Sequence, residues 1–329
     1  MKYRKFGNTD IQLSAIGLGC MSMNHGYGVF DDEDEAIATL EKSIEVGINF
    51  WDTADIYANG KNEELISRVL KPNRNKIFLA TKFGHMPYDN QNFSGLDCSP
   101  ANIKKAVEHS LKRLQTDFID LYYAHRIDPN VPVEETAGAM SELVQQGKVR
   151  YLGLSEASPN SIRKANAVHP ISALQSEYSL MTRDVESEIL TFCKEMKITF
   201  VPFSPLARAM LTNTLDISTL PENDFRKKLP RYQTKYEENN LKLAAAFADV
   251  ASQKGCTPAQ LALAWVLHQG DHIIPIPGTK KTQYLIENAA AVDINLTADD
   301  KALIDVVFKK YPDTGPRYGP EHQKYVDNA

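Results

Sequence analysis

Four ionisable residues stand at, or just beyond, the ends of apolar segments: Asp52, Tyr57, Lys82 and His125. Asp52, Lys82 and His125 each close a different apolar segment, and Tyr57 follows Asp52 by five residues in a loop that Gly60 keeps short. If these segments are neighbouring parallel strands, all four groups meet at one edge of the sheet. A carboxylate, a phenol, an amine and an imidazole in one cleft make a proton-transfer site.

Reduction of a carbonyl group is the chemistry that needs this set. A phenol has an ordinary pKa near 10, which a neighbouring ammonium lowers by stabilising the phenolate. Lys82 supplies that ammonium, Asp52 keeps it charged and in place, and His125 hydrogen-bonds the substrate oxygen. Tyr57 then donates a proton to this oxygen as a hydride reaches the carbon. Each residue alone has an ordinary structural reading, so only the combination carries the prediction.

Short apolar segments alternate with amphipathic segments along the chain, as expected when each strand is followed by a helix. The expected strands are 15–19, 48–52, 77–81, 118–124, 149–154, 172–176, 198–202 and 272–276. The expected helices are 31–46, 61–70, 100–114, 134–146, 159–167, 185–196, 242–254 and 282–291.

Eight strand and helix units in 329 residues predict an α/β protein with a closed (β/α)8 TIM barrel as a single domain. We expect a β-hairpin over 1–14, the barrel over 15–295, and an extra helix near 298–309 in a C-terminal region of 296–329. A doubly wound open sheet is the rival. It is weaker because the first strand carries Gly17-Leu18-Gly19 in place of Gly-x-Gly-x-x-Gly.

Three loops exceed what a plain barrel needs: 20–30, 83–97 and 204–240. In a barrel all three lie on the face that carries the active site. We expect the first two loops to form the substrate pocket, with further walls from Trp51, Arg126, Arg317 and Tyr318. Aromatic residues in these loops favour an apolar or aromatic aldehyde; they are Tyr27, Phe30, Phe83 and Tyr88.

Composition excludes several classes of partner. The net charge of −5 and the pI near 5.9 give no reason to expect nucleic acid or an anionic membrane. The four cysteines are scattered without a Cys-x-x-Cys pair, as in a reducing compartment. There is no apolar leader and no segment long and apolar enough to span a bilayer. We therefore expect a cytoplasmic protein that binds a small molecule; its oligomeric state stays open.

The four ionisable residues described above and their flanking motifs resemble the aldo-keto reductase superfamily over nearly the whole chain. The motifs are Gly47-Ile48-Asn49-Phe50-Trp51-Asp52-Thr53-Ala54 with Tyr57, Leu79-Ala80-Thr81-Lys82, His125-Arg126-Ile127-Asp128-Pro129 and Gly147-Lys148-Val149-Arg150-Tyr151-Leu152-Gly153-Leu154-Ser155. Ser155-Glu156 and Pro316-Arg317-Tyr318 are more like the bacterial and fungal branch with broad aldehyde reductase activity. The resemblance implies a (β/α)8 barrel with catalytic Asp52, Tyr57, Lys82 and His125.

The resemblance also implies an NADPH-dependent oxidoreductase that reduces aldehydes, with ketones left open. It implies substrate contacts from Tyr57, His125 and Arg126 and no metal. By the same resemblance Ser155 and Gln175 bind the carboxamide of the nicotinamide, and Phe203 stacks on its ring. The full set of implied cofactor contacts is Gly19, Cys20, Met21, Asp52, Ser155, Gln175, Phe203, Ser204, Pro205, Leu206, Arg208, Gly278, Thr279, Lys280, Glu287 and Asn288.

Preference for NADPH over NADH follows from the segment 275–281, which leads into a helix and carries Lys280 and Lys281. Backbone N–H groups at a helix start favour phosphate, and the lysines add positive charge. Two features depart from the family pattern. Glu156 stands where many members have Asn, and Ala207 and Ala209 replace common glycines, which stiffens the loop.

Two other functions remain as alternatives. One is a redox-sensing subunit that holds NADPH tightly within a larger complex and turns over slowly. The other is a metal-dependent barrel hydrolase, which requires clustered His and Asp ligands, whereas the eight histidines here are dispersed and no His-x-His follows the first strand. The physiological substrate and the direction of the reaction are left open.

Overall fold

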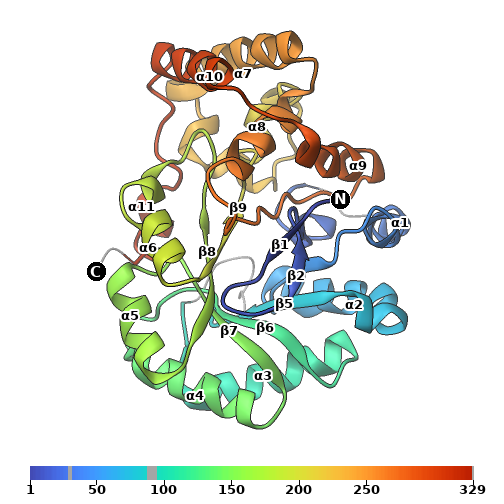
Figure 1. Ribbon diagram of the computed structural model, residues 1–329, viewed down its shortest axis with the longest axis vertical. Helices are drawn as coiled ribbons and strands as arrows, with labels where there is room; N and C mark the ends of the chain where they lie inside the picture. Colours follow the sequence, from blue (N-terminus) through green and yellow to red (C-terminus); the bar gives the residue numbers. More distant parts are fainter. Residues whose placement is uncertain (29–31, 87–94, 328–329) are drawn as a thin grey trace.

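The structure is a computed structural model that describes residues 1–28, 32–86 and 95–327. Seven parallel strands form one sheet in sequence order, from β3 to β9. These strands are β3 (Leu18–Gly19), β4 (Phe50–Asp52), β5 (Phe78–Phe83), β6 (Ile119–Ala124), β7 (Val149–Ser155), β8 (Ile171–Glu177) and β9 (Thr199–Phe203). Figure 1 shows the helices arranged around the outside of these strands. The predicted parallel barrel is confirmed.

The expected eighth strand, 272–276, does not form a regular strand, yet the same segment closes the barrel. The Ile274 N–H donates to Phe200 O (2.9 Å), and on the opposite side the Gly17 N–H donates to Pro275 O (2.9 Å). The segment carries Pro275 and is followed directly by Pro277; proline has no N–H to donate. The closure therefore consists of isolated bridges, from Ile273 to Phe200 of β9 and from Gly278 to Gly19 of β3.

The N-terminal hairpin, β1 (Tyr3–Lys5) and β2 (Gln12–Ser14), is confirmed as an antiparallel pair. Phe6 is buried in the barrel interior, where its ring lies 4.8 Å from that of Phe78 at the start of β5. The hairpin thus closes the end of the barrel at which the strands begin. The opposite end, where the strands finish, is left for the site.

The helices are α1 (Glu33–Glu45), α2 (Lys61–Asn73), α3 (Pro100–Leu114), α4 (Val133–Gln145), α5 (Pro159–Val168), α6 (Ile189–Glu195), α7 (Thr234–Lys254), α8 (Pro258–Leu267), α9 (Thr282–Ala290), α10 (Ala298–Lys310) and α11 (Pro320–Gln323). The sequence analysis missed α8, because eight of its ten residues are buried and a helix that is apolar all round shows no 3.6-residue periodicity. Its start nevertheless carries a capping box, with Thr257 and Gln260 bonded reciprocally.

Candidate active site

A buried charge pair forms the base of the site. Asp52 ends β4, and Lys82 is the penultimate residue of β5; their side chains are 3% and 0% exposed. The Lys82 ammonium donates to Asp52 Oδ1 and to Thr53 O (2.8 Å), and Gln175 Nε2 donates to Asp52 Oδ2 (2.8 Å). Burial raises the pKa of Asp52 and lowers that of Lys82, while each charge opposes the shift of the other. Each group therefore depends on its partner to stay ionised.

Tyr57 begins a tight turn, η2 (Tyr57–Gly60), directly above this pair. Its ring centroid lies 5.3 Å from Lys82 Nζ. The next two residues, Ala58 (φ 49°) and Asn59 (φ 53°), adopt the left-handed conformation that few side chains tolerate. The His25 ring supports the turn: it stacks on the Tyr57 ring at 5.7 Å, and its Nδ1 accepts from the Ala58 N–H (3.2 Å).

His125 follows β6 and completes the group, with its ring 5.9 Å from that of Tyr57. A second imidazole, His85, packs against it at 4.4 Å. Burial holds the pKa of His125 well below its usual range, and the charges of nearby groups act in the same direction. His125 is therefore neutral, and one of its ring nitrogens carries an N–H that can be donated to an oxygen.

The sequence predicts that Lys82 lowers the pKa of the Tyr57 phenol, and the structure differs from this prediction. Burial raises the pKa of Tyr57 well above its usual value, and the negative charge of Asp52 acts in the same direction. The charge of Arg126 opposes both. The protonated phenol is thus the stable form, and Tyr57 is poised to donate a proton rather than to accept one.

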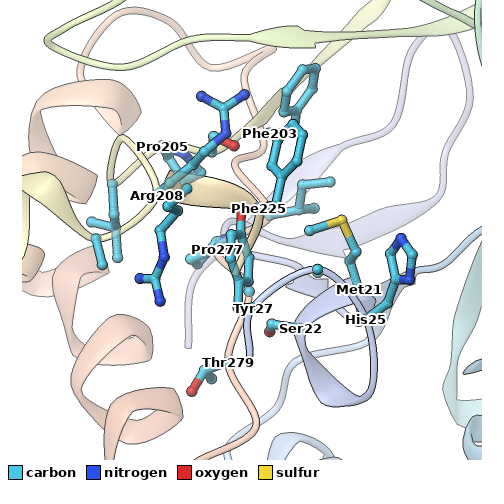
Figure 2. A pocket seen from close by; sticks show the side chains of 18 of the residues that line it. Met21, Ser22, His25, Tyr27, Phe203, Pro205, Arg208, Phe225, Pro277 and Thr279 are labelled. Atoms are coloured by element: carbon cyan, nitrogen blue, oxygen red, sulfur yellow. The ribbon is translucent and has the colours of Figure 1, made fainter. Parts of the chain in front are cut away.

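A cleft of about 1010 Å³ opens above these groups at the ends of the strands. Figure 2 shows Met21 and His25 on one side of this space and Phe203, Pro205 and Arg208 on the other. Of the four predicted catalytic residues, three line the cleft directly, and Lys82 lies beneath them. The predicted cofactor residues that line the cleft are Gly19, Met21, Asp52, Gln175, Phe203, Ser204, Pro205, Leu206, Arg208, Gly278, Thr279, Glu287 and Asn288.

Three predicted cofactor residues do not line the cleft. Cys20 is fully buried, and its thiol faces Leu18 O. Ser155 is 1% exposed, and its hydroxyl accepts from Arg126 Nη1 (3.2 Å). Lys280 stands beside the cleft, next to Thr279.

The expected substrate walls are partly wrong. Trp51 is fully buried in the layer outside the barrel, where its indole N–H donates to Ser43 Oγ (2.9 Å), and Phe83 is buried against Tyr122. Both immediately adjoin a catalytic residue in a strand, and successive strand residues point to opposite faces. Arg126, Tyr27 and Tyr318 line the cleft as expected, whereas Arg317 is bonded elsewhere. Phe30 and Tyr88 lie outside the described residues.

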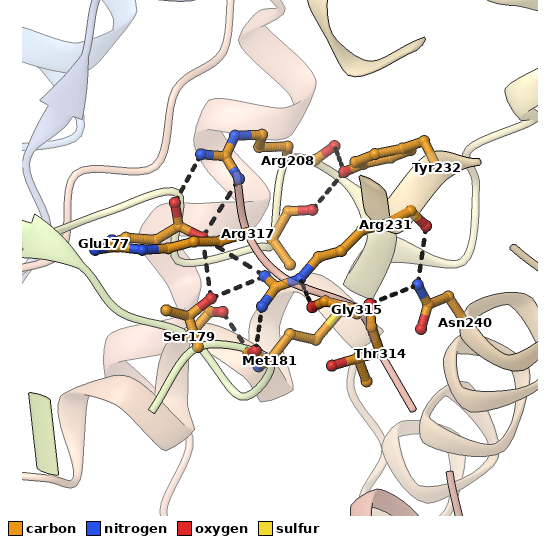
Figure 3. Close-up of polar contacts among 12 residues, drawn as sticks. Glu177, Ser179, Met181, Arg208, Arg231, Tyr232, Asn240, Thr314, Gly315 and Arg317 are labelled. Carbon is orange, nitrogen blue, oxygen red and sulfur yellow. Dashed lines mark hydrogen bonds and ion pairs between the residues drawn. The ribbon is translucent and has the colours of Figure 1, made fainter. Parts of the chain in front are cut away.

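A buried network connects the cleft to the C-terminal region, and Figure 3 shows its members around Glu177, the last residue of β8. Glu177 is fully buried and accepts from Arg208 Nη2 (2.6 Å), while Arg231 Nη1 lies 3.5 Å from its second oxygen. Arg231 also donates to Gly315 O (3.1 Å). Burial raises the pKa of Glu177, but the arginine charges outweigh it, so the pKa falls below its usual value. Glu177 is therefore ionised.

Glu156, one of the noted departures, belongs to the same end of the molecule. Its carboxylate accepts from Arg317 Nη1 (3.0 Å) and Nη2 (2.5 Å) and from the Glu177 N–H (2.8 Å). The segment around Arg317 is thereby fixed beside the ends of β7 and β8. The conformation of Tyr318, which lines the cleft, depends on this anchor.

The loop after β9 adopts left-handed backbone at Ala207 (φ 47°), Arg208 (φ 53°) and Ala209 (φ 76°). The Tyr232 hydroxyl donates to Ala207 O (2.7 Å) and contacts Arg208 O (3.0 Å), which holds the loop in this form. Ala207 and Ala209, which replace glycines common in the family, are thus both residues with strained backbone.

Replacing Ala209 with glycine is expected to raise the free energy of unfolding by up to about 1 kcal/mol. Left-handed backbone costs an alanine about 1–2 kcal/mol, and the greater entropy of an unfolded glycine offsets part of that gain. Chemical denaturation measures the change. Ala209→Val is the matched control, because a β-branched residue tolerates positive φ least, and it should destabilise the protein. Equal stability of both variants would contradict the strained conformation.

Low pH is expected to destabilise the fold through the histidines of the site. Burial holds the pKa of His25, His85 and His125 below the usual value near 6.5. The unfolded chain then binds protons that the folded chain does not, so stability falls as the pH drops below about 6.5, by up to about 1.4 kcal/mol per pH unit for each group. Denaturation at pH 7.5 and 5.5 measures this slope, and His125→Gln should reduce it. An unchanged slope in that variant would contradict a neutral His125.

Sequence reasoning missed several residues of the cleft. Ser22 and His25 come from the first long loop, and Phe225, Arg226 and Lys228 come from the loop after β9. The expected position of both loops on the active-site face indicates these residues as a group, and no sequence motif singles any of them out. Thr257 and Pro258, at the start of the missed helix α8, could have been found from its capping box.

In the described ranges, none of the helices is both long and apolar enough to cross a membrane. The same residues contain no group of three or more His, Cys, Asp or Glu side chains placed to hold a metal ion.

Comparison with known proteins agrees with the fold. The Aldo/keto reductase family matches residues 15–308. A probable aldo-keto reductase of Glycine max is 42% identical over 299 residues, covering 90% of this chain and 86% of the relative. Glycerol dehydrogenase from Gluconobacter oxydans superposes with a TM-score of 0.85 at 29% identity, covering 97% of this chain and 98% of that one.

A further solved structure is an aldo/keto reductase from Klebsiella pneumoniae in complex with NADP and acetate. It superposes with a TM-score of 0.73 at 26% identity, and the match covers 100% of each chain. The family match covers most of the sequence, and the barrel carries ionisable residues at the ends of its strands. Both observations identify the same family. The chain belongs to the aldo/keto reductase family and is an NAD(P)-dependent oxidoreductase.

Proposed function

We propose that this enzyme reduces aldehydes to primary alcohols with NADPH, and that Tyr57 donates the proton to the carbonyl oxygen. One observation carries the proposal: a protonated phenol, a neutral imidazole and a buried charge pair meet at the base of one cleft. In this arrangement the phenol can give its proton to a substrate oxygen while the imidazole donates a second hydrogen bond to the same oxygen. Ketones are a further possible substrate class of the same chemistry.

Each residue has a distinct part in the proton transfer. Tyr57 holds the proton at its hydroxyl, and His125 offers an N–H to the same substrate oxygen. Lys82 lies below the phenol and stabilises the phenolate that remains after transfer, and Asp52 keeps Lys82 charged. The Lys82 ammonium, 5.3 Å from the ring centroid, attracts the negative charge that forms as the proton leaves Tyr57, which favours the transfer.

The residues of the cleft fit a nicotinamide cofactor, which supplies the hydride when bound. Ser22 Oγ is buried in the cleft wall without a hydrogen-bond partner among the described residues, as expected of a group that meets a polar ligand. Phe203 offers an aromatic face, and Gln175 keeps its amide oxygen for the carboxamide because only its nitrogen is bonded to Asp52. These residues would hold the nicotinamide end.

The adenosine end would lie beside α9, where Thr279, before the helix, and Glu287 and Asn288, within it, line the cleft. Lys280 would add charge for the 2′-phosphate that distinguishes NADPH from NADH. The relative from Klebsiella pneumoniae was solved with NADP, which supports this choice. The preference for NADPH rests on these residues and on that relative.

Consumption of NADPH by the purified enzyme with a panel of neutral aldehydes tests the proposal. We expect turnover with NADPH, a lower kcat/KM with NADH, and a reduced difference between the two in Lys280→Met. Lys301 of α10 provides a matched control, since Lys301→Met removes a lysine from a helix that does not line the cleft. Binding of NADPH without turnover of any carbonyl compound would contradict the proposal.

A further inference from the structure

Arg126 places a positive charge at the catalytic end of the cleft. It follows His125 immediately after β6 and lines the cleft together with Tyr57. Among the described residues, its hydrogen bonds both use Nη1, which donates to His125 O (2.7 Å) and to Ser155 Oγ (3.2 Å). Within the described part of the chain, Nε and Nη2 have no acceptor, and no carboxylate lies within ion-pair distance of the guanidinium.

The charge of Arg126 reaches the groups that surround the reacting oxygen. Burial is the main cause of each pKa shift at this end of the cleft, and Arg126 contributes to six of them. Its charge favours the phenolates of Tyr57 and Tyr318 and opposes the cationic forms of Lys82, His85, His125 and His322. Arg126 also adjoins His125, whose ring lies 5.9 Å from that of Tyr57, so the guanidinium and the phenol belong to the same end of the cleft.

Other arginines of the cleft are neutralised by carboxylates. Arg208 Nη2 is paired with Glu177 (2.6 Å), and Arg226 Nη2 is paired with Asp224 (2.8 Å). Asp52, the carboxylate nearest the phenol, is already paired with Lys82. The charge of Arg126 therefore remains without a protein counter-ion among the described residues, at the end of the cleft where the substrate reacts.

We infer that the preferred substrates are carbonyl compounds that carry a carboxylate, and that Arg126 binds this carboxylate. The inference rests on the proposed carbonyl reduction and specifies its substrate class. The Nε and Nη2 atoms present two parallel N–H groups, the spacing that matches the two oxygens of a carboxylate. Such a substrate supplies the missing counter-charge while its carbonyl oxygen lies at Tyr57.

Matched pairs of aldehydes test the inference, because an amide has the shape of a carboxylate without its charge. The pairs are 4-carboxybenzaldehyde with 4-formylbenzamide, and succinic semialdehyde with 4-oxobutanamide. We expect the wild type to show a kcat/KM about 10- to 100-fold higher for the acid of a pair, as for a charge-assisted hydrogen bond. Arg126→Met should lower kcat/KM for the acids at least tenfold more than for the amides. Arg126→Lys, which keeps the charge and loses the planar fork, should retain part of the preference.

Three outcomes would overturn the inference. If the wild type reduces the acid and the amide of both pairs equally well, the carboxylate is not recognised, while carbonyl reduction stands. If Arg126→Met lowers kcat/KM equally for acids and amides, Arg126 positions the catalytic groups rather than binding the substrate charge. If none of the four aldehydes is reduced although NADPH binds, the proposed function fails and the inference fails with it.

Discussion

Replacing Tyr57 with phenylalanine is expected to lower kcat for aldehyde reduction by about 10²- to 10⁴-fold, the usual contribution of a positioned acid. The phenyl ring keeps its packing against His25 and His125 but has no proton to give to the carbonyl oxygen. Steady-state kinetics with benzaldehyde measure the loss. Fluorescence titration with NADPH should give a nearly unchanged Kd, because the Tyr57 hydroxyl contacts the reacting oxygen of the substrate and not the cofactor.

Tyr123 provides the matched control for this variant. It is buried on β6, and its ring lies 5.9 Å from Lys82 Nζ, but it does not line the cleft. Tyr123→Phe should therefore leave kcat within about threefold of the wild type, since a phenol outside the cleft cannot reach the substrate. A Tyr57→Phe enzyme that keeps its kcat would rule out Tyr57 as the proton donor.

Replacing Lys82 with methionine is expected to lower the free energy of unfolding by about 3–5 kcal/mol and to abolish turnover. The substitution leaves the Asp52 carboxylate buried without its counter-charge, which is the costly way to break a buried ion pair. It also removes the cation beneath the Tyr57 phenol. Chemical denaturation and kcat measure the two effects on the same protein.

The double variant Asp52→Asn with Lys82→Met separates these effects. Removing both charges should restore much of the stability lost in Lys82→Met, because no unpaired charge remains in the core. Gln175 can still donate to an asparagine oxygen at position 52. Activity should stay lost, since the phenolate has no cation. A double variant as unstable as the single one would show that packing of the Lys82 chain, rather than its charge, stabilises this site.

The arrangement of the candidate catalytic group could be predicted from sequence because three of its members occupy equivalent places, at or just beyond the ends of three adjacent parallel strands. One register therefore brings Asp52, Lys82 and His125 to one edge. Successive side chains of a strand point to opposite faces. The position of Trp51, one residue before Asp52, therefore indicates that it points away from the cleft. A large aromatic side chain is typical of a substrate pocket, but the position of Trp51 in the strand contradicts that role.

The network around Glu177 could not be predicted, because its members are far apart in the sequence and belong to loops. Arg231 precedes α7, and Arg317 follows α10, where no periodicity positions a side chain. The contribution of His25 was hidden for the same reason. Pairing of charges across loops depends on tertiary packing, which a single sequence does not specify.

The two carboxylates at the ends of β7 and β8 have a consequence for synthesis of the chain. Glu156 and Glu177 are made first, and the cations that compensate them, Arg208 and Arg317 among them, are added later. At about 5–20 residues per second, the ribosome reaches Arg317 roughly 8 to 32 seconds after Glu156. Until then Glu156, directly after β7, cannot take its buried position without unpaired charge. The end of β7 in a nascent barrel therefore stays open throughout this interval, when chaperones can bind it.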